Sequence, residues 1–311
     1  MPNVKHAFTS GKADGGDATL VQPSNWNAEH VVDQYVDFPD QANIPAAPTS
    51  GWLRTFARNR AGRALLHIIG PSGVDVALQP AFFGNSIVMW APSATTGQTA
   101  FGVTYTARNN GTGAAQSTPT RASTNAMTSL SRAQFGTGTT ATGASGTQTN
   151  LAVAWRGNAA NLGGFFFFSR FGIETLAADM RAFVGLSANN ATIAADPSTW
   201  ANTIGLTKDT ADSTWQLVQR NASTLTKTAT GCTVTAGQIL DFLLFAPPNG
   251  STITARLVDA VTGTVYVDDV VLNTTLPVNT TFLFMQAQCM SVTGTTAKIL
   301  SLNRMYLESD L

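Results

Sequence analysis

The final third of the chain alternates apolar and polar residues in short runs, and this pattern constrains the fold more than any other feature. In STITARLVDA, Ile253, Ala255 and Leu257 share one face with Asp259. Period-two alternation is typical of a strand with one buried face. Runs of this kind recur at intervals of about 8 to 15 residues between turn sequences, which favours an antiparallel β-sandwich. They are TWQLVQRN, TLTKTAT, QILDFLLFAPPNG, STITARLVDAVTG, TVYVDDVVLN, TFLFMQAQCMSV and TAKILSLNRMYLES.

Further strands are predicted upstream, where aromatic and β-branched runs lie between Gly-, Asn- and Pro-rich turns. The runs are SIVMWAP, AFGVTYTAR, NLAVAWRG and GGFFFFSRFGIE. In NLAVAWRG, period two places Leu151, Val153 and Trp155 on one strand face. The phenylalanines at 165 to 168 favour a strand buried on both faces, in a sandwich core or a subunit interface. Residues 107–150 are low in complexity, so they form either a flexible loop or two polar strands with long loops.

The chain divides into three predicted parts. Residues 1–50 are rich in turn formers, with a short helix possible near Trp26, and they end in a Pro-rich linker. Residues 51–85 form a β-hairpin neck from WLRTFAR and RALLHII, with the turn at residues 59–62. Residues 86–311 form the sandwich. The neck carries Arg54, Arg58, Arg60 and Arg63, which form either a solvated face or ion pairs with a neighbouring subunit.

Charge is scarce. Charged residues make up 12% of the chain, against about 25% in typical soluble domains. The formal net charge is zero, which removes the electrostatic argument for binding nucleic acid or a membrane surface. We find no signal-peptide run at the start and no apolar stretch of membrane-spanning length, so no membrane insertion is expected. A neutral chain repels its own copies weakly, which permits self-association.

Motifs for catalysis or metal binding are missing. His6, His30 and His67 have no metal-ligand spacing, and neither Cys232 nor Cys289 has a CxxC partner. The two cysteines either pair or are small buried residues. No cofactor is predicted, and the chain is not expected to be an enzyme. Cleavage of a polysaccharide would need two carboxylates on either side of the bond. The loose candidates are Glu174, Asp179, Asp241, Asp259, Asp268 and Asp269.

Binding of a glycan without cleavage is a more plausible activity, because it needs only an aromatic platform and a few polar groups. Candidate platform residues are Trp200, Trp215 and Tyr266, although a tryptophan within a strand such as DSTWQL is more often buried in the core. Candidate polar groups are the loop residues Asn189, Asn190 and Asn249.

Several motifs resemble those of tailed-bacteriophage fibre and spike proteins. At the N-terminus these are FTS and GDATLVQPSNWNA, followed by ARNRAGR and GPSG in the neck. The C-terminal half resembles phage β-sandwich modules of the concanavalin-like kind. That likeness rests on RFGI, FVGL, DSTWQL, APPNGS, the Leu276-Pro277 step and RMYLESDL. The resemblance implies an all-β virion protein: a jelly-roll or concanavalin-like sandwich preceded by an extended anchor and a hairpin neck.

The resemblance further implies a homotrimeric tail fibre or spike subunit. Leu20, Val21 and Trp26 would attach it to other virion proteins of the tail, collar or capsid, because they are large apolar residues among turn formers. The sandwich would contact a host-surface polysaccharide. Two alternatives remain open. One is a purely structural head fibre, collar or decoration protein, and the weaker one is a polysaccharide depolymerase.

Overall fold

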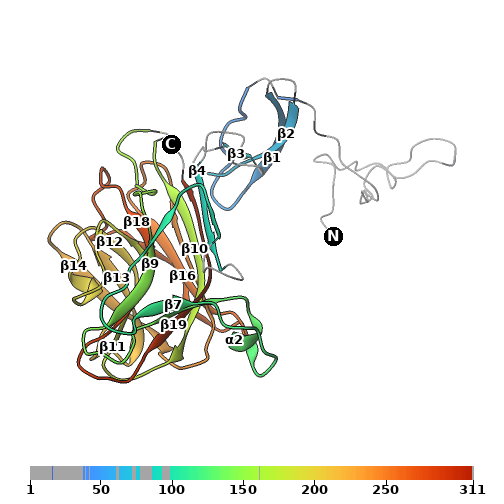
Figure 1. Cartoon of the computed structure of the whole chain (residues 1–311). Coiled ribbons are helices and arrows are strands. Elements are labelled where there is room, and N and C mark those ends of the chain that lie inside the picture. Colours follow the sequence, from blue (N-terminus) through green and yellow to red (C-terminus); the bar gives the residue numbers. More distant parts are fainter. Residues whose placement is uncertain are drawn as a thin grey trace.

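The computed structural model describes residues 43–60, 63–71, 75–77, 86–92, 99–160 and 162–309, together with positions 16, 38, 40 and 41. In this part of the chain, two antiparallel sheets pack face to face and a small third sheet lies outside them (Figure 1). The predicted all-β antiparallel sandwich is therefore confirmed. The proposed attachment residues Leu20, Val21 and Trp26 lie outside the described residues.

The larger of the two packed sheets, called the large sheet below, has nine strands among the described residues. Its main path is β17 (Val265–Leu272), β16 (Ile253–Asp259), β15 (Leu240–Ala246), β10 (Phe165–Thr175), β19 (Ile299–Ser309), β4 (Ser86–Ala91) and β5 (Thr99–Phe101). Off this path, β8 (Ala133–Gly136) pairs with β19, and β7 (Ala115–Ser117) pairs with β8.

The second sheet, the small sheet, has seven strands in the same described ranges. Its order is β14 (Leu225–Thr233), β13 (Thr214–Arg220), β12 (Thr203–Lys208), β11 (Met180–Ser187), β18 (Phe284–Ser291), β9 (Ala144–Thr149) and β6 (Tyr105–Ala107). The third sheet is the neck: the predicted hairpin of β1 (Arg54–Arg60) and β2 (Arg63–Ile69), extended by β3 (Asp75–Ala77). A short helix, α2 (Ala126–Ser129), begins at the capping residue Asn125.

One hydrophobic core fills the space between the large and small sheets. Alternation along each strand supplies it, as the sequence predicts: Ile253, Ala255, Leu257 and Asp259 of β16 all point inward and are buried. The largest fully buried aromatic side chains of this core are Trp90, Trp215, Phe135, Phe167, Phe171 and Phe242. Burying each such side chain contributes about 1.5–3 kcal/mol, so the two sheets hold together without a disulfide.

The strand register defines two ends of the sandwich. Ser86 pairs with Ser309, and Ser309 pairs with Phe165, so the first sandwich strand begins and the last one ends at the same end. We call this the upper end, as it is drawn in Figure 1. It also carries the loops at 150–164, 247–252 and 273–283. The opposite, lower end carries the turns at 176–179, 209–213 and 292–298.

Most of the predicted strands form, but NLAVAWRG does not, and two other runs differ from the prediction. All seven runs of the final third are strands, β13 to β19. The run AFGVTYTAR is split into β5 and β6 around Gly102, whose left-handed backbone (φ 89°) interrupts the strand. The phenylalanine run is buried on one face only: Phe165 and Phe167 enter the core, whereas Phe166 and Phe168 are half-buried on the outer face. The sequence of residues 107–150 predicts either a flexible loop or two polar strands with long loops. They contain β7, α2, β8 and β9.

Both lateral edges of one side of the sandwich are irregular. The register shifts between Thr214 and Gln216 beside edge strand β14, and twice between Ala255 and Val258 beside edge strand β17. Neighbouring residues of a regular strand point to opposite faces, which for Asp268 and Asp269 is not what the structure shows. A left-handed backbone at Asp269 (φ 47°) lets both carboxylates bind Arg256. Such bulges and edge charges discourage pairing with another chain.

Cys232 and Cys289 are both free and buried. Cys289 lies in the core, where its thiol donates to the backbone oxygen of Phe135 at 3.2 Å. Burial raises the pKa of the Cys289 thiol to about 12 and that of Cys232 to about 11. The open choice made from the sequence therefore resolves to two small buried residues rather than a bridge.

The alternation along β10 can be tested by unfolding. Phe167→Ala removes a fully buried ring, so we expect it to lower the free energy of unfolding by about 3–5 kcal/mol in urea titrations. Phe166→Ala is the matched control on the same strand. Its ring lies on the outer face, and its loss should cost less than about 2 kcal/mol. Equal losses in the two variants would contradict the assignment of faces.

Candidate functional site

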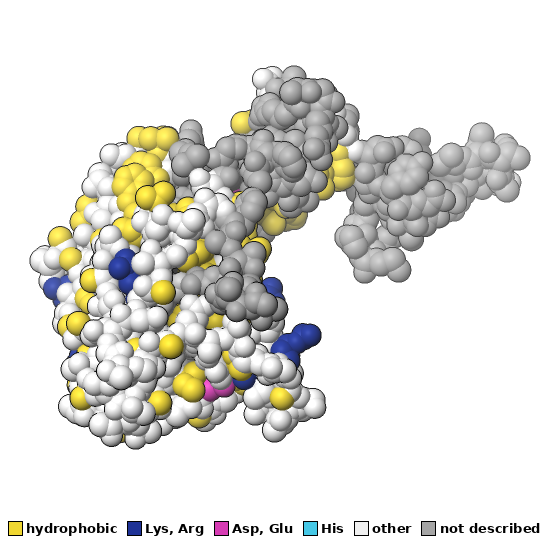
Figure 2. Space-filling view, viewed as in Figure 1, with side chains coloured by type: hydrophobic (Ala, Val, Ile, Leu, Met, Phe, Trp, Pro, Cys, Tyr) yellow, Lys and Arg dark blue, Asp and Glu magenta, His cyan; other side chains and the backbone are white. Residues whose placement is uncertain are grey.

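Two aromatic rings stack at the upper end of the sandwich. The rings of Trp155 and Phe282 have centroids 5.0 Å apart and planes inclined by 20°. Phe282 is 52% exposed, and Leu151 nearby in sequence is 61% exposed. Figure 2 shows hydrophobic side chains gathered at this end of the molecule. An exposed phenylalanine ring thus lies stacked on the half-buried ring of Trp155, and we call this pair the aromatic platform.

Backbone hydrogen bonds hold the two rings together. The amides of Val153 and Ala154 donate to the Leu283 oxygen at 2.8 and 3.2 Å, and the Leu283 amide donates back to Ala154 at 2.7 Å. Trp155 and Phe282 are the residues next to this isolated bridge, so their side chains meet across it. The stack is therefore fixed by main-chain geometry before any ligand arrives, which lowers the ordering cost of binding.

Arg156 ties three loops together beneath the platform. Its guanidinium donates to the backbone oxygens of Pro277 at 2.9 Å and Gly250 at 2.6 Å. The Asn249 amide donates to the oxygens of Arg156 and Leu162 at 2.8 and 3.0 Å. Burial lowers the pKa of Arg156 from its ordinary value. This cation serves to hold the loops, because both terminal nitrogens of its guanidinium donate to carbonyl groups of other loops.

A tight glycine turn completes the framework. Gly157 has a left-handed backbone (φ 85°), and a Cβ there would lie 1.7 Å from the Leu162 oxygen. The Gly164 amide donates to the Trp155 oxygen at 2.9 Å. Only glycine permits this close return of the chain.

Period-two alternation predicts Trp155 on a regular strand, and this gives no sign of the platform. That prediction is wrong: residues 150–157 form no strand, and only the bridge between Ala154 and Leu283 is present. Phe282 was assigned to a strand as well, although β18 begins two residues later. The signal that could have revealed the loop was the glycine spacing after Arg156, at 157, 163 and 164.

The aromatic residues proposed from the sequence are not open platforms. Trp215 is 1% exposed and meets Phe171 edge-on, as the core alternative expected. Trp200 is half-buried and meets Phe183 edge-on. Tyr266 packs against the core, and its hydroxyl accepts a hydrogen bond from Gln238 at 3.1 Å. Of the proposed asparagines, only Asn249 lies beside the aromatic platform.

Asn189 and Asn190 instead belong to a loop that covers the outer face of the small sheet. Gln286 donates to the Asn189 oxygen at 3.3 Å, and Gln148 donates to the Asn190 side chain at 3.1 Å. Gln288 accepts from the Ile193 amide at 2.8 Å. This glutamine row explains why β9 and β18 are buried on both faces. It also leaves little of that face for a ligand.

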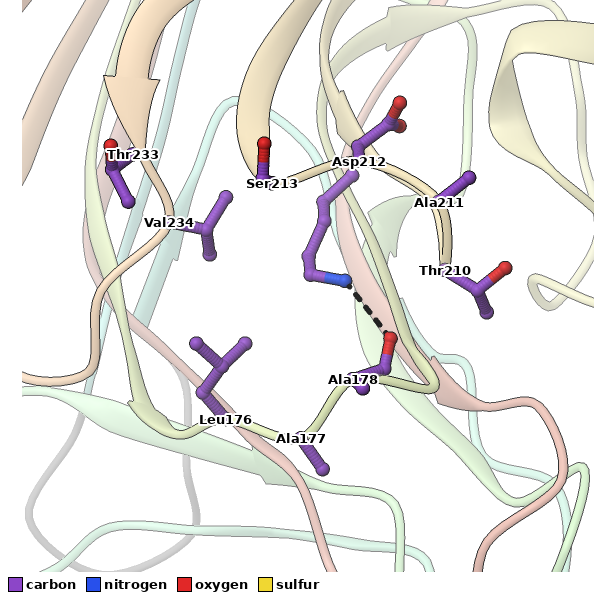
Figure 3. A pocket seen from close by; sticks show the side chains of 10 residues that line it. Leu176, Ala177, Ala178, Thr210, Ala211, Asp212, Ser213, Thr233 and Val234 are labelled. Atoms are coloured by element: carbon purple, nitrogen blue, oxygen red, sulfur yellow. Dashed lines mark hydrogen bonds between the residues drawn. The ribbon is translucent and has the colours of Figure 1, made fainter.

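A pocket of about 550 Å³ lies at the lower end (Figure 3). Figure 3 shows the aliphatic side chains of Leu176 and Val234 on one side, and Asp212 and Thr210 on the other. Its volume falls within the usual range for ligand pockets. Its lining is Leu176, Ala177, Ala178, Lys208, Thr210, Ala211, Asp212, Ser213, Thr233 and Val234, so no aromatic ring contributes.

The charged groups of this pocket already have partners. The Lys208 ammonium, 3% exposed, donates to the oxygens of Met180, Asp209 and Ala178 at 2.9, 3.1 and 3.4 Å. Burial lowers the pKa of Lys208, against the opposing fields of nearby carboxylates. Asp212 accepts from Lys227 at 2.8 Å and from the Asp209 amide at 2.7 Å. The pocket therefore presents hydroxyl and aliphatic side chains to a ligand. Its charged groups are already engaged with protein partners.

The carboxylates considered for cleavage are dispersed in separate pairings. Glu174 binds Arg132, Gln134 and Ser301, and these bonds hold its pKa below the ordinary value despite burial. Asp241 pairs with Arg170 at 2.6 Å. Asp259 caps the turn after β16 by accepting the amides of residues 261 and 262. A general acid needs a raised pKa, whereas the pKa values of Glu174 and Asp259 are lowered.

Asp179 forms an ion pair with a fully buried lysine. It accepts from Lys298 at 2.9 Å and from the Gly294 amide at 2.7 Å. The Lys298 side chain is fully buried and also donates to Ser291 at 2.7 Å. Burial would raise the pKa of Asp179, but the bonds to Lys298 and Gly294 outweigh it, so its pKa lies well below the ordinary value. The pair fastens the β10–β11 turn to the segment before β19.

In the described ranges, no three His, Cys, Asp or Glu side chains come together as a metal site would need. In those same ranges, we find no helix that is long and apolar enough to cross a bilayer.

No protein-family model and no curated protein matches the chain in sequence. Solved structures do resemble it. A protein of unknown function from Shewanella oneidensis MR-1 superimposes with a TM-score of 0.50 at 11% identity, over 73% of this chain and 87% of the other. For peanut lectin the TM-score is 0.49 at 8% identity, over 72% and 97%. A carbohydrate esterase of the Shiga toxin-encoding bacteriophage phi24B gives 0.39 at 13% identity, over 72% and 98%. At these identities the likeness concerns the fold alone.

The Asp179–Lys298 pair makes a prediction about stability. Asp179→Asn leaves a buried ammonium without its counter-charge, and we expect a loss of about 3–5 kcal/mol near neutral pH. A carboxyl with a lowered folded pKa stabilises the protein above its unfolded pKa, ordinarily 3.8, and this stabilisation is lost as the pH falls towards the folded pKa. The difference between variant and wild type in urea unfolding should therefore shrink with falling acid pH.

Asp268→Asn serves as the control. Asp268 is 77% exposed in its pair with Arg256, so its loss should change the free energy of unfolding by less than about 1 kcal/mol. If the two substitutions cost the same, Asp179 does not have the structural role described.

Proposed function

We propose that the chain is a structural protein of a tailed-phage virion, a homotrimeric tail fibre or spike subunit attached by its N-terminal segment, whose sandwich binds a host-surface glycan. The sequence resemblance supports the virion role. The exposed Phe282 ring, stacked on the half-buried Trp155 ring, carries the binding role. An aromatic ring face complements the C–H face of a sugar ring.

The lower pocket is a weaker site for a glycan. It has no aromatic surface, and its charged groups bind one another. We also propose that the protein binds without cleaving, because the carboxylates considered for cleavage have separate partners and the pKa values of Glu174, Asp179 and Asp259 are lowered rather than raised. A head fibre, collar or decoration protein remains the competing role.

Loss of either platform ring should weaken glycan binding. In the full-length protein, Trp155→Ala or Phe282→Ala removes an aromatic contact of about 1.5–3 kcal/mol, so we expect affinity for purified host-surface polysaccharide to fall by about tenfold or more. Surface plasmon resonance on immobilised polysaccharide measures this affinity. Unfolding curves confirm that the variants fold.

Two controls localise the effect. Trp52→Ala removes another exposed tryptophan, 69% exposed in the neck region, and should leave affinity unchanged. Ser213→Trp obstructs the lower pocket from an exposed position and should also have no effect. Normal binding by Trp155→Ala together with loss in Ser213→Trp would move the site to the pocket.

Attachment to the virion can be separated from glycan binding. Replacing Leu20, Val21 and Trp26 together by alanine should leave the trimer mass in sedimentation and the unfolding curve of the sandwich unchanged. We expect the variant to be missing from purified virions, because each lost apolar contact contributes about 1.5–3 kcal/mol in every subunit. Normal incorporation of the variant, or a wild-type protein that sediments as a monomer, would overturn this part of the proposal.

A further inference from the structure

The three loops around the aromatic platform contain almost no charge. Residues 150–164, 247–252 and 273–284 are dominated by Asn, Thr, Pro, Gly, Ala and apolar residues, and Arg156 is their one charged residue. The guanidinium of Arg156 donates to two backbone oxygens. The surface therefore presents no free cation for a carboxylate or sulfate and no carboxylate for an amino sugar.

The lower end shows the opposite distribution. There, Asp179, Lys208, Asp209, Asp212 and Lys298 lie in successive turns and bind one another or the backbone. The chain is thus able to build charged clusters at a loop end, and the three loops around the platform differ from the lower turns in composition. The loop at 188–202 also leaves the upper end and carries Asp196, so the neutrality belongs to the three platform loops.

The exposed polar groups of the upper loops are neutral amides and hydroxyls. The Asn249 backbone is left-handed (φ 52°), and its backbone N–H donates to Arg156 and Leu162. The residue is otherwise exposed. Asn158 and Thr280 are also exposed in these loops. Such groups donate to and accept from sugar hydroxyls, which need both.

From these observations we propose that the platform binds an uncharged pyranose unit of a glycan, with the ring face against Trp155 and Phe282 and its hydroxyls met by neutral amide and hydroxyl side chains. This inference rests on the proposed glycan-binding function and narrows its ligand class. An acidic glycan would have to leave its carboxylate or sulfate groups without a cationic partner at this surface.

The test uses the full-length protein and matched polysaccharides. Dextran, a galactan and a mannan are each immobilised beside their own carboxymethylated form, and binding is measured at about 0.02 and about 0.5 M salt. We expect at least one neutral polymer to bind, its carboxymethylated form to bind at least about tenfold more weakly, and the neutral affinity to change less than about twofold with salt. Trp155→Ala should abolish the neutral binding, whereas Trp52→Ala should not.

The outcomes distinguish a failure of the neutral-sugar proposal from a failure of the proposed glycan-binding function. Tighter binding of the carboxymethylated forms, weakened by salt, overturns the neutral class and leaves a glycan-binding protein. Neutral binding that survives Trp155→Ala overturns the platform as the site. If neither these polymers nor purified host-surface polysaccharide bind at either salt concentration, the proposed glycan-binding function fails as well.

Discussion

The backbone bridge between Ala154 and Leu283 is the constraint on which the functional surface depends. It joins the loop before β10 to the loop before β18, one from each side of the sandwich, and sets two aromatic side chains against each other. The core below fixes both strands, so the bridge inherits its rigidity from the packing of the two sheets. Without this bridge, Trp155 and Phe282 would be unrelated loop residues.

Charge and aromatic surface are divided between the two ends of the molecule. At the lower end, buried lysines and aspartates fasten turns, and each charge has a partner. At the upper end, the equivalent fastening is done by main-chain bonds, glycines and Arg156. Charges paired in this way are not available to a ligand. In the part of the chain that the structure describes, the three loops around the platform contain no such ion pair, so the exposed Phe282 ring can make contacts outside the chain.

The sequence was a sound guide where local pattern decides structure. Alternation placed Ile253, Ala255 and Leu257 correctly in the core, and all seven strands of the final third formed. It failed where distant segments decide. Trp155 follows a period-two pattern, yet its partner is 127 positions away, and the glycines after it turn the chain out of any sheet. Likewise, the loop that covers β9 and β18 through Asn189 and Gln286 cannot be inferred from either segment alone.

The central claim is that a sugar ring lies on the Trp155–Phe282 stack. A crystal structure of the full-length protein with a bound neutral oligosaccharide tests it most directly. We expect density for a pyranose ring in van der Waals contact with the exposed face of the stack. We also expect the three loops to keep the positions that they hold without ligand. Density in the lower pocket beside Val234, or on the glutamine row of the small sheet, would contradict it.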